Sequence, residues 1–315
     1  ERDGYYIIRN VLDAGEVSAL RELALAEHEK ERARRGGAPF RSMLAPHVMQ
    51  MPEFFRLMFR PSVVSALREI AGDDMYYVCN LTLSRDTCGL VKGRFLGFER
   101  YGWHVDSSEM GKLARFIRPD HRVVKIGIFL QDNTDEWGGG IDVVPGTHRF
   151  PLRLDNVNLS YKFKTLRDQI GILTRSIRAP IRAGDALVHD CNVQHRGTVP
   201  QKLIGNVTEA ECRDGGFHDV PYEHSKLVMR WDIGRGDDVQ RFFEHCVERG
   251  CKEAERGNYS VYSAMASMPE TKFHPKFRRL AEEAGVDILA PDTETAERVT
   301  QLTKDHPSMN LAHLQ

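Results

Sequence analysis

The residues best suited to chemistry in this chain are a histidine and an aspartate two positions apart, in the run Trp103-His104-Val105-Asp106. In an extended segment, residues two apart point to the same face, so the His104 imidazole and the Asp106 carboxylate leave the chain together. A histidine from a distant strand, His195, would complete a facial set of two imidazoles and one carboxylate. Such a set holds a non-haem Fe(II) and leaves coordination positions open for a co-substrate and O₂.

This spacing has plainer interpretations, which stay open at this point. The chain contains 13 histidines, so a His-x-Asp triplet also arises by chance, here as a surface pair on a loop after Gly102. A second histidine, His189, follows the same Gly184-Asp185 turn as His195 and is an alternative ligand. We interpret His148 as a structural or substrate-side histidine rather than a ligand.

The composition describes an ordinary globular enzyme and excludes several other classes. Of the 315 residues, 41% are hydrophobic and 28% are charged, and the formal net charge is −1, which gives no electrostatic case for nucleic acid or an anionic membrane as a partner. No apolar stretch approaches the roughly 18 residues of a membrane span. The six cysteines form no Cys-x-x-Cys pair, which argues against structural zinc and favours free thiols. We therefore expect a soluble cytoplasmic globular protein.

Strand-like segments must position these residues, because they dominate the middle of the chain. Several short apolar or β-branched runs are separated by glycine turns, with no helices alternating between them: 76–84, 122–130, 141–144, 186–189 and 226–233. This pattern indicates an antiparallel sandwich or barrel rather than a parallel sheet.

Helices are predicted at both ends of the chain. Asp13 and Glu16 have the spacing of a capping box before an amphipathic segment, and prolines open two further helices at 52–59 and 61–70. From Asp237 onward the apolar residues recur at helical spacing, along a face made of Val239, Phe242, Phe243 and Cys246.

The order of these pieces resembles the phytanoyl-CoA dioxygenase (PhyH-like) family of Fe(II)/2-oxoglutarate-dependent oxygenases. The resemblance covers approximately residues 1–235 and lies in the segments DGYYIIRNVLDAGEVSALREL, GWHVD, LQD, DVVPGTHR and AGDALVHDCNVQHRG. It implies a mainly β fold with flanking helices, in which N-terminal helices buttress a double-stranded β-helix (jelly roll/cupin-like) core. We expect this oxygenase domain to span 1–235 and a helical C-terminal extension, 236–315, to pack on the same domain.

The resemblance also implies the ligand set. The family places its distal histidine eleven residues after the turn glycine, here Gly184, which selects His195 over His189. His104, Asp106 and His195 would then hold Fe(II), and 2-oxoglutarate and O₂ would be converted to succinate and CO₂ while a metabolite is oxidised. Halogenases of this superfamily replace the carboxylate with a small residue, so Asp106 favours hydroxylation or a related two-electron oxidation over halogenation.

The contact for the far carboxylate of 2-oxoglutarate departs from the family pattern. Relatives use an arginine about ten residues after the distal histidine, because a guanidinium binds a carboxylate through two parallel hydrogen bonds. Here an insertion-like stretch, 200–223, interrupts that spacing. Arg230, Lys226 and His224 share one strand parity and all stay candidates, with Arg230 favoured.

Two further residues align with co-substrate contacts of relatives. Asn80, in the strand before the His-x-Asp motif, aligns with an amide that reaches 2-oxoglutarate. The Ser or Thr that often follows the distal histidine by two residues is Gly197 here, and Thr198 comes next. The glycine-rich segment 86–101 and the acidic stretch 200–223 are expected to shape the substrate site.

Three alternatives stay open in the sequence. The same ligands could serve oxidative cyclisation, desaturation or epimerisation instead of hydroxylation. A non-redox metal-binding jelly roll is a separate class, which the displaced arginine keeps in consideration. The tail after residue 235 either covers the barrel or forms a homodimer contact.

Overall fold

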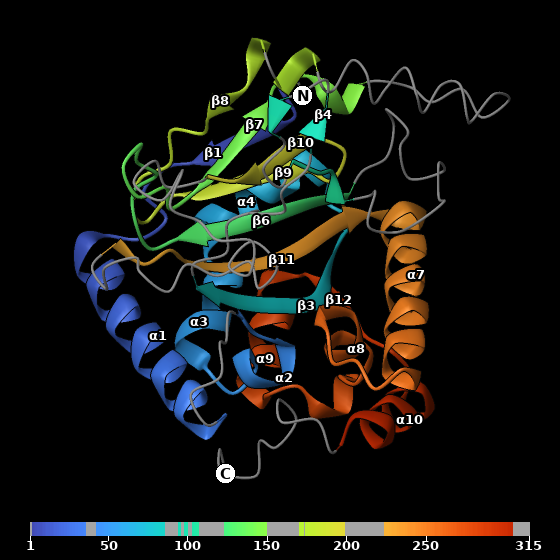
Figure 1. The fold of residues 1–315 in the computed structure, drawn as a ribbon. Coiled ribbons are helices and arrows are strands. Elements are labelled where there is room, and N and C mark those ends of the chain that lie inside the picture. Colours follow the sequence, from blue (N-terminus) through green and yellow to red (C-terminus); the bar gives the residue numbers. More distant parts are fainter. Residues whose placement is uncertain are drawn as a thin grey trace, which may run out of the picture. The chain divides into compact units, whose positions relative to one another are not determined.

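The structure is a computed structural model, and it describes residues 2–35, 42–85, 94–95, 98–99, 103–106, 123–149, 170–172, 174–198 and 224–304 (Figure 1). The chain forms two compact units. The first unit comprises Glu1–Arg21, Ser84–His121 and Ile128–Val228, and the second comprises Glu22–Leu83, Arg122–Gly127 and Met229–Gln315. The predicted substrate segment 200–223 and the side chains of 86–101 lie outside the described residues.

The first unit is built from antiparallel strands. Strand β1 (Tyr5–Ile8) pairs with β9 (Ala186–Asp190), with Tyr5 opposite His189. A separate three-stranded sheet has the order β10 (Gln194–Gly197), β7 (Ile141–Val144), β8 (Ile177–Arg178), and Figure 1 shows these strands side by side. The backbone of β4 (Arg94–Phe95) and β5 (Phe98–Glu99) forms a short antiparallel ribbon. The predicted antiparallel arrangement is confirmed for these pairs.

An apolar cluster lies in the first unit, and the strands that carry the candidate ligands contribute to it. Its buried members are Phe129, Ile141, Val143, Ala179, Ile181, Leu187, Val193 and Val228. Because side chains alternate along a strand, His189 lies on the same inner face of β9 as Leu187. Val193, in the bend just before β10, also belongs to this cluster, and its carbonyl oxygen lies 2.9 Å from Nδ1 of His195. The hydrophobic cluster therefore holds the chain next to both histidines.

The turn before β9 depends on Gly184, which has φ +87°. A Cβ at this position would lie 2.5 Å from the carbonyl oxygen of Leu12, so only glycine fits. The Leu12 amide donates to the Gly184 carbonyl at 3.0 Å. The turn thus fixes the start of β9 against the chain that follows β1.

The second unit holds most of three long strands, β6 (Val123–Phe129), β11 (Leu227–Arg235) and β3 (Met75–Arg85), which are neighbours in that order. Strand β12 (Asp287–Leu289) continues this order and is parallel to β3, and β2 (Ser42–Met43) also pairs with β3. The five predicted strand segments agree with the observed strands to within two residues. The tail was expected to be helix-prone, and β12 is a short strand within it.

The helices begin where the sequence predicts. Helix α1 (Ala14–Arg34) opens with the expected capping box, because the Glu16 amide donates to the Asp13 carboxylate at 2.8 Å and the Asp13 amide donates to Glu16 at 3.1 Å. The predicted proline-opened helices are also present, the first of them divided into two short pieces: α3 (Pro52–Phe55), η1 (Arg56–Phe59) and α4 (Pro61–Ala71).

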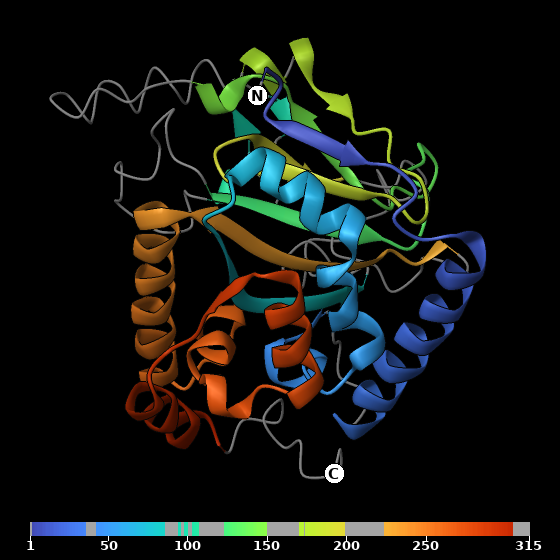
Figure 2. The ribbon, with the colours of Figure 1, turned by 180° about the vertical axis from the view of Figure 1, so that it is seen from behind.

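The C-terminal helices of the second unit are α7 (Gly236–Glu255), α8 (Val261–Ala266), α9 (Pro275–Ala284) and α10 (Thr293–Thr303). Helix α7 buries three of the four predicted residues, Val239, Phe242 and Cys246, while Phe243 is half-buried. Helices α7, α8 and α10 pack together around Cys251, Ala254, Ala266 and Val299 (Figure 2). The division into a 1–235 domain and a 236–315 extension stays a prediction, although α7 begins at its boundary.

None of the helices in the described part of the chain is both long and apolar enough to cross a bilayer. Among the described residues there are also the short helices α2 (Ala45–Val48), η4 (Thr147–Arg149) and η8 (Glu270–Lys272).

Candidate metal centre

An antiparallel bridge between His104 and His195 forms the base of the candidate site. The His104 amide donates to the His195 carbonyl at 2.9 Å, and the His195 amide donates to the His104 carbonyl at 2.9 Å. Residues directly opposite each other in such a pair send their side chains to the same face. The two imidazole rings accordingly lie 4.4 Å apart, centroid to centroid.

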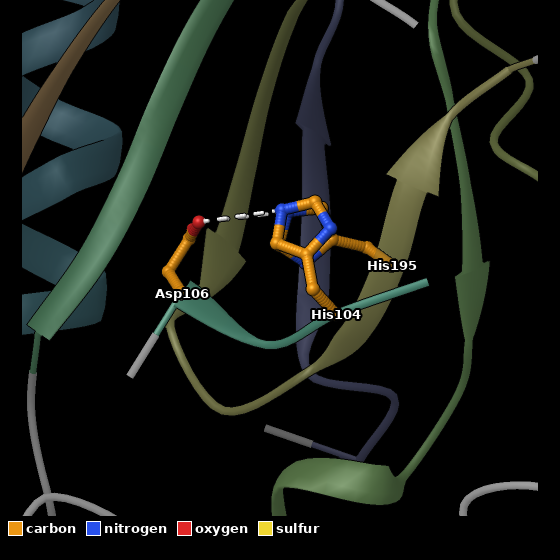
Figure 3. A group of neighbouring side chains, drawn as sticks. All are labelled: His104, Asp106 and His195. Atoms are coloured by element: carbon orange, nitrogen blue, oxygen red, sulfur yellow. Dashed lines mark ion pairs between the residues drawn. The ribbon is translucent and has the colours of Figure 1, made fainter. Parts of the chain in front are cut away.

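Asp106 completes the group, as Figure 3 shows. Its Oδ1 lies 3.8 Å from Nε2 of His104 and 3.8 Å from Nε2 of His195. One ligand atom from each of the three residues lies within 4.8 Å of the others. The structure therefore brings together the three residues that the sequence analysis selected as metal ligands.

The protonation state of His195 suits a metal ligand. Its Nδ1 lies 2.9 Å from the carbonyl oxygen of Val193, and because a carbonyl only accepts, Nδ1 carries the proton and donates it. The Nε2 lone pair is thereby left on the side of Asp106. Burial holds the pKa of His195 well below its ordinary value, against the opposing effect of Asp106. The imidazole is neutral, which is the form that binds a metal, so this donor set fits a divalent cation.

A partly buried ion pair, Arg196 with Asp142, lies on the other side of β10 from His195. Because β10 alternates, Arg196 points away from His195, and its guanidinium lies 4.8 Å from the ring centroid of Trp103. The Arg196 Nε and Nη2 donate to Oδ2 of Asp142, each at 2.8 Å. Asp142 also accepts from the Thr198 hydroxyl at 2.9 Å. Arg196, the residue after His195, thus binds Asp142 and also contacts Trp103, the residue before His104.

His189, the alternative ligand in the sequence, lies beside the group but outside it. Its Nε2 is 3.3 Å from Oδ2 of Asp106, and its ring is 4.5 Å from that of His195. It therefore contacts the carboxylate oxygen that does not face the two histidine ligands. Sequence reasoning missed this contact, and the available signal was the shared face of Leu187 and His189 on β9.

Two predicted co-substrate contacts converge at one carbonyl. Lys226 is 4% exposed, and its Nζ donates to the carbonyl oxygen of Gly140 at 2.8 Å. The amide of buried Thr198 donates to the same oxygen at 3.0 Å. His224 lies elsewhere in this unit, stacked on Trp137 with ring centroids 4.8 Å apart. Among these candidates, Lys226 and Thr198 are neighbours that share one hydrogen-bond acceptor.

The other two predicted contacts belong to the second unit. The Asn80 amide group donates to the Asp232 carboxylate, and the Asp232 backbone amide donates to Oδ1 of Asn80 at 3.0 Å. Both ends of the Asn80 side chain are thus engaged by Asp232. Arg230 lies on β11 and is half-buried. Their roles toward 2-oxoglutarate stay predictions.

The family model for phytanoyl-CoA dioxygenase (PhyH) matches residues 1–199, a span that contains all three candidate ligands. The chain belongs to the phytanoyl-CoA dioxygenase family. This membership confirms the resemblance seen in the sequence and the predicted fold class, a mostly antiparallel β fold with flanking helices. It also confirms that the protein is an oxidoreductase of the non-haem iron, 2-oxoglutarate-dependent dioxygenase class.

Solved structures of three enzymes resemble this chain. EctD from S. alaskensis with bound Fe is 20% identical, with a TM-score of 0.46, over 74% of this chain and 73% of EctD. SnoN, a non-heme alpha ketoglutarate dependent epimerase from nogalamycin biosynthesis, is 17% identical with a TM-score of 0.44, over 74% and 77%. HygX from Streptomyces hygroscopicus with nickel and 2-oxoglutarate bound is 14% identical with a TM-score of 0.42, over 74% and 83%. No curated protein matches the chain significantly.

Proposed function

We propose that this protein is an Fe(II)- and 2-oxoglutarate-dependent dioxygenase that hydroxylates a small-molecule metabolite. The observation that carries the proposal is the convergence of His104, Asp106 and His195 in a chain of the phytanoyl-CoA dioxygenase family. When bound, the iron supplies the oxidative chemistry, which converts 2-oxoglutarate and O₂ to succinate and CO₂ and oxidises the substrate. The same ligands would also support cyclisation, desaturation or epimerisation.

The chain's own residues prepare the site for that chemistry. His195 presents a neutral Nε2 because its Nδ1 proton is committed to Val193. Asp106 supplies a negative charge that partly offsets the charge of a divalent cation. The side chains of His195 and Asp106 are 7% and 11% exposed, so two of the three ligands are shielded from bulk water, while His104 is 35% exposed. The backbone bridge sets the spacing of the two imidazoles before any metal arrives.

For the far carboxylate of 2-oxoglutarate, we favour Lys226 over the other candidates. Lys226 is a buried cation in the same unit as the three ligands, and a buried ammonium gains most from a carboxylate partner. Thr198 shares the Gly140 carbonyl as an acceptor with Lys226, but its hydroxyl proton is donated to Asp142, so Thr198 is less favoured. His224 and Arg230 stay alternatives, while Asn80 is the least favoured because Asp232 occupies its amide.

The test is anaerobic addition of Fe(II) and then 2-oxoglutarate, followed by visible spectroscopy. Bidentate 2-oxoglutarate on iron gives a metal-to-ligand charge-transfer band, which we expect in the wild type and not in His195→Ala. Admission of O₂ should then release succinate. Iron binding without the band or succinate would contradict the 2-oxoglutarate assignment, and failure to bind iron would contradict the metal site itself.

A further inference from the structure

The two carboxylate oxygens of Asp106 face different histidines. Oδ1 lies 3.8 Å from Nε2 of each histidine ligand, whereas Oδ2 lies 3.3 Å from Nε2 of His189. We propose that His189 is a positioning residue that holds Oδ2 and thereby directs Oδ1 to the metal. The proposal rests on the proposed function, because it assumes that His104, Asp106 and His195 bind the metal.

A carboxylate needs such a partner because its two oxygens are chemically equivalent. The terminal torsion of aspartate is broad, so an unrestrained Asp106 could present either oxygen, or both, to a cation. A hydrogen bond from the Nε2–H of His189 to Oδ2 removes this freedom. The distance is near the long end of the hydrogen-bond range, but an ionised acceptor strengthens the interaction.

His189 is itself held rigidly enough to act in this way. It lies in β9 opposite Tyr5 of β1, and its neighbour on the same face, Leu187, is part of the apolar cluster. The side chains of His189 and Asp106 are 7% and 11% exposed. A hydrogen bond in such a poorly hydrated environment is stronger than the same contact in water.

The geometry distinguishes a positioning role from a ligand role for His189. The atoms that lie within 4.8 Å of one another, one from each residue, belong to His104, Asp106 and His195. The short contact of His189 is to the oxygen on the other side of the carboxylate. A fourth protein ligand would also occupy a position that the co-substrate and O₂ require. His189 therefore acts on the metal through Asp106.

The expected consequence is a change in metal affinity without a change in the ligand set. Residues that orient a metal ligand through hydrogen bonds typically account for about 10- to 100-fold in metal affinity. Removal of the His189 donor should weaken metal binding by a factor in this range, because the ligand atoms remain while their orientation is lost.

The experiment compares His189→Phe with His189→Gln and measures Co(II) dissociation constants from the visible spectrum of the bound ion. Phenylalanine keeps the ring without a donor, and a glutamine amide can donate from nearly the position of Nε2. We expect about 10- to 100-fold weaker binding in His189→Phe and recovery of most of it in His189→Gln. The spectrum at saturation should keep its wild-type shape in both. His47→Gln, at a buried histidine of the second unit, is the control and should bind as the wild type does.

Each other outcome overturns the proposal in a recognisable way. Wild-type affinity in His189→Phe, or equal weakening in both variants, would show that the donor is not what matters. An altered Co(II) spectrum at saturation would make His189 a ligand. If His189→Phe does not fold, as judged by thermal unfolding of the metal-free protein, His189→Leu replaces it in the same comparison. If the wild type does not bind Co(II), the proposed function is overturned, and this inference with it.

Discussion

His104 and His195 exchange two backbone hydrogen bonds, each 2.9 Å long, although 91 residues separate them in the sequence. His195 is also in register with Val143 of β7. The ligand geometry is therefore set by strand register, and a slip of one residue would turn an imidazole to the opposite face. The site should accordingly respond to substitutions that loosen this register without touching the ligands.

Asp142 offers the first such test, because it joins Arg196, on the strand that carries His195, to Thr198 just after that strand. Asp142→Ala leaves the buried Thr198 hydroxyl and the Arg196 guanidinium without their carboxylate acceptor. We expect the free energy of unfolding, measured in urea, to fall by about 1–3 kcal/mol. The control is Asp135→Ala, at an exposed carboxylate paired with Arg178, which should change stability by less than about 1 kcal/mol. Equal losses in the two variants would contradict a supporting role for Asp142.

Lys226 provides the second test, which concerns the 2-oxoglutarate contact. Lys226→Ala should raise the KM for 2-oxoglutarate by about 10- to 150-fold, the equivalent of one lost hydrogen bond to a charged group of about 1.5–3 kcal/mol. Lys226→Arg keeps the charge and should recover part of the loss. The matched variant is Arg230→Gln. If Arg230→Gln raises the KM and Lys226→Ala does not, the contact belongs to Arg230, which the sequence favoured.

Part of the site could be predicted from the sequence because its determinants are local. The two-residue spacing of His104 and Asp106 places both side chains on one face of any extended segment. The capping box of Asp13 and Glu16 is likewise contained within four consecutive residues, and the structure reproduces it. Family order added His195, which local spacing could not separate from His189.

Other features could not be predicted because they depend on register between distant segments. The contact of His189 with Oδ2 of Asp106 requires the placement of β9 relative to the His-x-Asp segment, which no local pattern encodes. The approach of Lys226 to the Gly140 carbonyl joins residues 86 apart. Strand β12 was missed for a similar reason, since three residues gain strand character only by pairing with β3.

Gly184 gives the third test, of the turn that leads into β9. Gly184→Ala adds a Cβ 2.5 Å from the Leu12 carbonyl oxygen at a positive φ, so we expect the free energy of unfolding to fall by about 3 kcal/mol. Gly146 is the matched control in the same unit, because it has a similar φ of +79° and its nearest neighbour would lie 3.9 Å from the added Cβ. Gly146→Ala should cost only the backbone strain, about 1 kcal/mol. Urea unfolding of both variants measures the difference, and equal costs would refute the close approach at Leu12.

His47 gives the last test, of stability against pH. Burial is the main cause that lowers the pKa of His47 below its ordinary value of 6.5, opposed by Glu31 and Glu27 and reinforced by Arg34 and Arg35. The unfolded chain therefore binds a proton at a pH where the folded chain does not. The contribution of His47 to stability is full above about pH 6.5 and is lost as the pH falls from there toward the lowered pKa of the folded state.

The measurement is the free energy of unfolding at pH 7.5, 6.5 and 5.5, chosen to span the ordinary histidine pKa of about 6.5. His47→Gln should lose less stability over this interval than the wild type. Glu27→Gln should lose more, because the Glu27 carboxylate, 3.9 Å from Nε2 of His47, favours the protonated ring, and its removal lowers the folded-state pKa further. Identical pH dependence in the wild type and His47→Gln would show that another group controls acid stability.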